Sequence, residues 1–276
     1  MRIRPNIIPR NMRDFTACLF LVFMIPIIYW FEVFVALPFY FGGEFTIAHY
    51  IHNVISIYLL VNVVGNFVAA IMIDTSIRGE VMPSTQLPTW HFCDSCQCFV
   101  PPRSWHCSTC STCILKRDHH CNFTACCIGH RNHRYFIMFL FYFALSTAYS
   151  TFFNLYYLWS TFSYWSTINM LKLLFPFAIL VTGMDNTMEQ VYRLLSVLVI
   201  VGLISSGCLL YYQTCNLLRG RVMYEKVKNL NVYNDDDLKM NLAMVLGENW
   251  YLALICPFVP SNLIHDGIHW DSEKYK

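Results

Sequence analysis

The segment that decides the fold runs from Cys93 to Phe136 and reads CDSCQCFVPPRSWHCSTCSTCILKRDHHCNFTACCIGHRNHRYF. It holds nine of the 13 cysteines in the chain. The spacing Cys-x2-Cys occurs three times in it, and this spacing lets two thiolates bind one tetrahedral zinc ion. The segment therefore indicates a metal-binding ribbon.

Enough ligands are present for two closed sites, each with three cysteines and one histidine. The eight candidates are Cys93, Cys96, Cys107, Cys110, Cys113, Cys127, His106 and His120. Spacing alone leaves open whether His119 or His120, and whether Cys121, Cys126 or Cys127, is the ligand. A ribbon with so small an apolar core needs folding free energy from its metals, on the order of 10 kcal/mol per site.

Thiols are left over after both sites are filled. Asp118-His119-x-Cys121 has the composition of a nucleophile with its base and a carboxylate that orients the base. From these residues alone, two hypotheses stay open: nucleophilic catalysis and a purely structural ribbon.

The composition of the whole chain excludes a soluble protein. Of its 276 residues, 56% are hydrophobic and 13% are charged, whereas roughly a quarter of the residues of an average soluble domain are charged. The mean hydropathy is +0.43. A net charge of +2 gives no basic footprint for nucleic acid, which we exclude as a partner.

Four apolar runs are each long enough to cross a bilayer, which takes about 20 residues. They are Phe15 to Leu37, His49 to Ile73, Tyr135 to Trp159 and Leu194 to Tyr212. Two weaker patches, Leu171 to Val181 and Trp250 to Val259, are shorter and are predicted to be interfacial or re-entrant.

The distribution of Lys and Arg predicts the orientation, because cytoplasmic flanks are enriched in both. Four precede the first run, six lie between the second and third, seven follow the fourth, and only Lys172 and Arg193 remain. Both termini and the ribbon are therefore expected in the cytosol, where cysteines stay reduced. Glu32 and Arg193 lie near the lumenal ends of their spans and are expected to snorkel to the interface.

The predicted fold is an α-helical integral membrane protein with four transmembrane helices and a cytosolic two-zinc cysteine-rich domain between helices 2 and 3. Its expected parts are a cytosolic tail (1–14), helices 1 and 2 (15–73), the cysteine-rich domain (74–134), helices 3 and 4 with a lumenal loop (135–212) and a cytosolic C-terminal region (213–276).

The chain closely resembles the DHHC family of protein S-acyltransferases, named after the tetrapeptide that stands here as Asp118-His119-His120-Cys121. The family pattern also contains paired cysteines, a Pro-x-Arg, the run His-Cys-x2-Cys-x2-Cys, and a cysteine and a glycine after the tetrapeptide. This chain has all of them in the same order. The matching positions are Cys93, Cys96, Pro101, Arg103, His106, Cys107, Cys110, Cys113, Cys127, Gly129, Asn132 and Phe136.

The resemblance implies two structural zinc ions and a catalytic cysteine. One zinc would be held by Cys93, Cys96, His106 and Cys113, and the other by Cys107, Cys110, His120 and Cys127. Cys121 would be the nucleophile, His119 its base and Asp118 the group that orients His119. The implied reaction is two-step acyl transfer from palmitoyl-CoA, through an acyl-enzyme, to cysteines of substrate proteins.

The expected partners follow from that reaction: acyl-CoA, the bilayer, and membrane-associated proteins with cytosolic juxtamembrane cysteines. Four basic residues near the tetrapeptide are candidates for binding the CoA phosphates, or equally for anchoring the spans. They are Lys116, Arg117, Arg131 and Arg134. The expected membrane is that of the endoplasmic reticulum or Golgi.

Two departures from the family pattern bear on activity. The Pro-Trp that commonly follows the tetrapeptide is Asn122-Phe123, and the Thr-Thr-x-Glu motif after the fourth span is Val222-Met223-Tyr224-Glu225. The alternative hypothesis is a catalytically inactive, zinc-stabilised membrane scaffold. A transporter is disfavoured because the spans contain no clustered charges.

Overall fold

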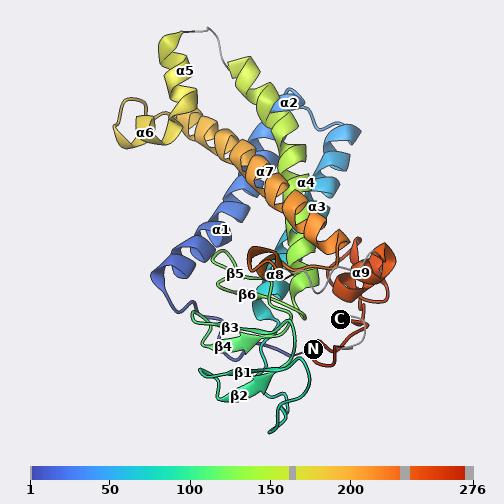
Figure 1. Cartoon of the computed structure of the whole chain (residues 1–276). Coiled ribbons are helices and arrows are strands. Elements are labelled where there is room, and N and C mark those ends of the chain that lie inside the picture. The colour runs from blue at the N-terminus through green and yellow to red at the C-terminus, as the bar shows by residue number, and fades with distance from the viewer. Residues whose placement is uncertain (1, 162–165, 231–236, 271–276) are drawn as a thin grey trace. The chain divides into compact units, whose positions relative to one another are not determined.

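The computed structural model describes residues 2–161, 166–230 and 237–270, so 231–236 and 271–276 of the predicted C-terminal region lie outside the described residues. Within the described residues, four helical segments are long and apolar enough to cross a membrane: Met12–Tyr40, Ile47–Met72, His133–Thr161 and Met188–Leu218. Figure 1 traces them as α1 with α2, α3, α4 and α7. The four predicted spans are confirmed as helices, each longer than its apolar run.

The first span combines three pieces, and the other three spans are single α-helices. It consists of α1 (Met12–Phe31), a five-residue π-helical stretch (Glu32–Ala36) and α2 (Leu37–Tyr40). The other long helices are α3 (Ile47–Met72), α4 (His133–Thr161) and α7 (Met188–Leu218).

The chain divides into two compact units. A helical unit comprises Val22–Val63 and Leu140–Leu209, and a ribbon unit comprises Met1–Leu21, Val64–Phe139 and Leu210–Lys276. Each long helix contributes one end to each unit, and the candidate site lies in the ribbon unit.

The core of the helical unit joins the first, third and fourth spans. Its buried members are Phe31, Ala36, Leu37, Phe153 and Leu195. Beside them, Asn154 donates a 2.6 Å hydrogen bond to the carboxylate of Glu32, which is only 8% exposed. Arg193 is 7% exposed and lies 3.2 Å from Glu189. Both side chains have polar partners within the protein, and their expected reach to the membrane interface stays a prediction.

The two weaker apolar patches form short helices. Leu171 to Val181 falls on α5 (Thr167–Leu174) and α6 (Pro176–Val181), which begins at its proline. Trp250 to Val259 contains only α10 (Trp250–Ala253). Their predicted interfacial position stays a prediction.

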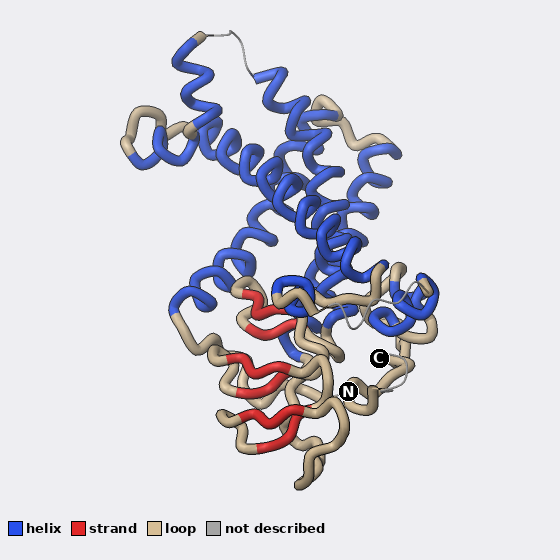
Figure 2. The backbone as a smooth tube through the Cα atoms, in the orientation of Figure 1, coloured by secondary structure: helices blue, strands red, loops and turns tan. Residues whose placement is uncertain are grey.

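The cysteine-rich segment forms three small antiparallel hairpins, drawn in red in Figure 2. The first pairs β1 (His91–Cys93) with β2 (Cys98–Val100). The second pairs β3 (Trp105–Cys107) with β4 (Thr112–Ile114), and the third pairs β5 (His119–Cys121) with β6 (Cys126–Ile128). Three-residue strands bury little apolar surface, so the hairpins need support from outside their own strands.

The three turns are built alike. Gln97, Ser111 and Ala125 stand just before the second strand of their hairpins and have φ angles of 51°, 50° and 49°. This left-handed conformation costs a non-glycine residue free energy, so it persists only where the surroundings require it. The strained residue occupies the same position in all three hairpins.

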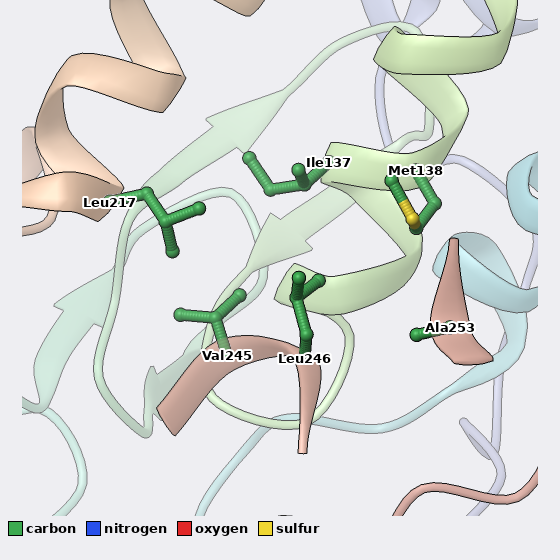
Figure 3. Packing of buried hydrophobic residues seen from close by; sticks show 6 residues of the cluster. All are labelled: Ile137, Met138, Leu217, Val245, Leu246 and Ala253. Carbon is green, nitrogen blue, oxygen red and sulfur yellow. The ribbon is translucent and has the colours of Figure 1, made fainter. Parts of the chain in front are cut away.

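After α7 the ribbon unit contains the short helices α8 (Met223–Val227), α9 (Leu238–Leu246) and α10. Of these, α9 and α10 pack on the start of α4 and the end of α7. Figure 3 shows the buried cluster that they share with the two long helices, which consists of Ile137, Met138, Leu217, Val245, Leu246 and Ala253.

The ribbon is tied to α3 and α4 at one tightly packed corner. Asn132, 1% exposed, accepts a 2.9 Å hydrogen bond from the Gly129 amide and donates 3.0 Å bonds to the carbonyls of Ala70 and Cys127. Gly129 has no room for a side chain. A Cβ there would lie 2.6 Å from the Leu115 carbonyl oxygen and 2.7 Å from Cγ2 of Ile114.

We predict that Gly129→Ala destabilises the protein by about 1–3 kcal/mol or more, because backbone atoms would have to move apart. The matched control is Gly207→Ala in α7, where a Cβ meets nothing within 4 Å. That variant should be neutral or up to about 1 kcal/mol more stable. Thermal unfolding of the two variants in detergent measures the difference, and equal melting temperatures would contradict this account.

Candidate active site and metal centres

Two groups of Cys and His side chains in the ribbon unit have the composition of metal sites. The first is Cys93, Cys96, His106 and Cys113, and the second is Cys107, Cys110, His120 and Cys127. Within each group the ligand atoms all lie within 4.8 Å of one another. These are the same two sets of four that the family resemblance implies.

The spacing of the ligand atoms fits a tetrahedral zinc ion. Bonds of 2.3 Å to sulfur and about 2.0 Å to nitrogen would place nitrogen and sulfur about 3.5 Å apart, and two sulfurs about 3.8 Å apart. In the second group, Nδ1 of His120 lies 3.6, 3.4 and 3.6 Å from the sulfurs of Cys107, Cys110 and Cys127. The sulfurs of Cys110 and Cys127 are 3.7 Å apart.

The first group is slightly less regular but has the same form. Nδ1 of His106 lies 3.7, 3.3 and 3.9 Å from the sulfurs of Cys93, Cys96 and Cys113. Both groups therefore suit an ion that prefers three thiolates and one imidazole, and neither leaves a ligand position for a substrate.

Each group links two consecutive hairpins. The first hairpin supplies Cys93, at the end of β1, and Cys96, in its turn. The second hairpin supplies His106 and Cys113, which face each other across β3 and β4. The pattern repeats one hairpin later: Cys107 ends β3, Cys110 lies in the second turn, and His120 and Cys127 are paired across β5 and β6.

The third hairpin differs from the first two, because no further hairpin follows it in the described part of the chain. Cys121 ends β5, as Cys93 ends β1 and Cys107 ends β3. The position three residues later, a cysteine in the first two hairpins, is Thr124 here. Among the described residues, Cys121 is the one cysteine at the end of a first strand that belongs to neither metal group.

The neighbours of Cys121 form a relay of polar groups. His119 stands two residues before Cys121 in β5 and lies close enough to lower the pKa of its thiol. The Nδ1 atom of His119 lies 2.7 Å from Oδ2 of Asp118, which is fully buried in the ribbon unit. Phe136 packs its ring edge-on against His119, with centroids 5.0 Å apart. The structure therefore brings together the three residues expected to be catalytic.

Sequence reasoning missed the groups that hold Asp118. Gln213 of α7 donates a 2.8 Å hydrogen bond to Oδ2, and the backbone amide of Met223 donates a 2.6 Å bond to Oδ1. Met223 stands where the family motif has a hydroxyl, yet its backbone amide reaches Asp118 whichever side chain is present. In the sequence, a glutamine at position 213 beside a long apolar run is the one feature that points to such a contact.

Glu225 fixes the segment that contacts Asp118. Its buried carboxylate pairs with Arg103 through two hydrogen bonds of 2.6 and 2.8 Å, and also accepts the Val222 amide at 3.1 Å. Arg103 in turn lies 4.8 Å from the Trp270 ring centroid. The Pro-x-Arg of the ribbon is thus joined to the C-terminal region by a bidentate ion pair.

The electrostatics of the relay favour a charged pair of Cys121 and His119. Burial raises the pKa of the Cys121 thiol, but the hydrogen bond and charge of His119 outweigh it, and the pKa lies below its ordinary value. For His119, burial lowers the pKa, but the hydrogen bonds to Asp118 and Cys121 outweigh it and raise the pKa to about 9. A thiolate beside an imidazolium is the reactive form of a cysteine nucleophile.

The four basic residues considered for CoA binding all have partners in the protein. Lys116 is 3% exposed, and burial lowers its pKa to about 7. Arg134 donates to the carbonyls of Val259 and Ser261 at 2.6 and 3.2 Å. Arg117 donates to the His106 carbonyl at 2.7 Å, and Arg131 lies 2.5 Å from Glu80. Binding of the CoA phosphates by these four residues stays a prediction.

The fold and the site together define a helical membrane protein with a ribbon of two Cys3His groups and a free cysteine beside a His-Asp pair. A family model described as DHHC palmitoyltransferase matches residues 86–230. The chain belongs to this DHHC palmitoyltransferase family.

Curated relatives of the chain carry the name probable palmitoyltransferase ZDHHC24. The protein from Danio rerio is 30% identical over 225 residues, which cover 80% of this chain and 75% of the relative. The protein from Mus musculus is 33% identical over 225 residues, covering 78% of this chain and 76% of the relative. The Homo sapiens protein is 31% identical over 220 residues, covering 76% and 74%.

We predict that Glu225→Ala destabilises the protein by about 3–5 kcal/mol, because it removes the bidentate carboxylate partner of the buried Arg103 guanidinium. Glu80→Ala is the matched control, since Glu80 pairs with Arg131 at a position where its side chain is 24% exposed. Loss of that partly exposed pair should cost about 1 kcal/mol or less. Thermal unfolding of both variants is the measurement, and an equal loss in the two would refute the buried-pair account.

Proposed function

We propose that this protein is a protein S-acyltransferase that moves a long-chain acyl group, palmitoyl in the first instance, from acyl-CoA to cysteines of substrate proteins. The observation that carries the proposal is the arrangement at Cys121. It is a cysteine left out of both metal groups, on the same strand as a histidine whose Nδ1 lies 2.7 Å from a buried carboxylate.

In the first step, the Cys121 thiolate attacks the thioester carbonyl carbon of the acyl-CoA. A new carbon–sulfur bond forms to Cys121, and the bond to the CoA sulfur breaks. The His119 imidazolium gives its proton to the departing CoA thiolate, so the products are free CoA and an acyl-enzyme.

In the second step, the neutral His119 takes the proton from the thiol of a substrate cysteine. That sulfur attacks the acyl carbon, and the bond to Cys121 breaks. Cys121 leaves as a thiolate beside the newly formed imidazolium, which restores the starting state. Asp118 keeps Nδ1 of His119 engaged, so that Nε2 faces the reacting sulfur, and it stabilises the imidazolium in both states.

The residues that would hold zinc are the two sets of four described above. Bound there, the ions would supply folding free energy to a ribbon that buries little apolar surface. Because each set is complete with four protein ligands, we assign the zinc ions a structural role.

The membrane setting suits the proposed donor. Each buried methylene is worth about 0.8 kcal/mol, so a sixteen-carbon chain gains on the order of 10 kcal/mol in apolar surroundings. We propose that both termini and the ribbon face the cytosol, that the substrates are membrane-associated proteins with juxtamembrane cysteines, and that the membrane is that of the endoplasmic reticulum or Golgi.

We predict that the purified protein takes up label from labelled palmitoyl-CoA as a hydroxylamine-sensitive thioester, and that Cys121→Ser abolishes the uptake. Cys126→Ser is the matched control, because Cys126 faces Cys121 across the same hairpin and belongs to neither metal group. It should keep its label. Zinc content should stay at two ions per chain in all three proteins.

If the wild type stays unlabelled while it holds both zinc ions, the ribbon is folded but inert, and the inactive scaffold becomes the better hypothesis. If Cys121→Ser is labelled as strongly as the wild type, the nucleophile is another residue.

Removal of the metal provides a further prediction. A strong zinc chelator should abolish acyl uptake and expose the six ligand cysteines to alkylation, because the hairpins depend on the ions for their fold. Mass spectrometry of the alkylated peptides measures the exposure. Retention of full acyl uptake after both ions have left would show that the ribbon folds without metal.

A further inference from the structure

The side chain of Asp14, at the start of the first span, reaches the second metal group. Its Oδ2 atom lies 2.9 Å from Nε2 of His120, 106 positions away in the sequence. The side chains of Asp14 and His120 are shielded from water, since they are only 3% and 13% exposed. Both residues belong to the ribbon unit.

The geometry of His120 determines which of its ring nitrogens carries a proton. Nδ1 faces the three cysteine sulfurs of the second group at 3.4 to 3.6 Å, which is the position of a metal ligand. A neutral imidazole that ligates through Nδ1 carries its hydrogen on Nε2. Nε2 therefore donates to Asp14, which is the arrangement in which a carboxylate orients a metal-bound histidine and makes it a stronger ligand.

The start of α1 aims the carboxylate. Asn11 stands immediately before the helix, and its Oδ1 accepts the Asp14 amide at 2.8 Å. Its Nδ2 donates to Oδ2 of Asp14 at 2.9 Å. The side chain of Asn11 thus caps the helix, whereas the carboxylate of Asp14 is not used for capping.

We propose that Asp14 is a positioning residue for the second zinc site: its carboxylate holds the ring of His120 in the ligating orientation and slows loss of the metal. The inference rests on the proposed zinc sites and goes beyond them, because Asp14 lies outside the cysteine-rich segment.

The contact also bears on the nucleophile. His120 and Cys121 are consecutive residues of β5, so an ordered His120 keeps the end of the strand that carries Cys121 in place. The N-terminal segment is thereby part of the support of the candidate active site.

The test measures loss of zinc from each group separately in the full chain, purified in detergent with its zinc. The protein is incubated with a chelator and iodoacetamide, and mass spectrometry follows alkylation of the two sets of cysteines with time. The variants are Asp14→Ala and Asp14→Asn, which keeps the size and one oxygen acceptor. Asp94→Ala is the control, an exposed carboxylate between two ligands of the first group.

We expect Asp14→Ala to speed alkylation of Cys107, Cys110 and Cys127 about 10- to 100-fold, the range by which loss of such a partner weakens metal binding. Cys93, Cys96 and Cys113 should react at the wild-type rate. Asp14→Asn should fall between the wild type and Asp14→Ala, and Asp94→Ala should leave the second group unchanged.

Wild-type rates at the second group in Asp14→Ala, or an equal acceleration at both groups, would overturn the inference. Should Asp14→Ala fail to fold, Asp14→Asn decides: a wild-type rate at the second group overturns the inference, and a faster one supports it. The assay needs no acyl transfer, so the inference can fail while Cys121 still accepts label. A wild type that binds no zinc would overturn both the zinc sites and the role of Asp14.

Discussion

The ribbon depends on one constraint, the tetrahedral grouping of three thiols and one imidazole contributed by two successive hairpins. No hairpin contains a complete group, because the turn supplies two ligands and the following hairpin supplies the other two. Three-residue strands cannot bury enough apolar surface to fold alone. The fold of each hairpin is therefore coupled to that of its neighbour, and the left-handed residues Gln97 and Ser111 lie in the two turns that contribute ligands to this coupling.

The same constraint accounts for the position of Cys121. A chain of hairpins in which each turn is completed by the next one must end with an incomplete turn, and here its cysteine stays free of the metal groups. The incomplete turn is supported from outside the ribbon. Gln213 and the Met223 amide hold Asp118, Glu225 with Arg103 holds the segment around Met223, and Asp118 holds His119.

The substituted family motif keeps its contacts with the candidate active site. The sequence alone suggests that loss of the two hydroxyls, at Val222 and Met223, removes hydrogen bonds to this site. In the structure Val222 is fully buried, its amide bonds to Glu225, and the contact with Asp118 comes from the amide of Met223. Backbone amides are present whatever the side chain, so the relay keeps its partner.

The sequence by itself determined the four spans, the two sets of metal ligands through the family pattern, and the Asp118-His119-Cys121 arrangement. The spans depend on local hydropathy, which a linear chain displays directly, whereas the ligand sets and the candidate catalytic residues follow from the family resemblance. Only the tertiary structure decided that Asp14, Gln213 and Met223 support the site and that Lys116 is buried. The three supporting contacts join residues about one hundred positions apart, and the fourth feature is a charged side chain placed in the interior. No local pattern in a single sequence shows which distant side chain will contact a buried carboxylate or imidazole.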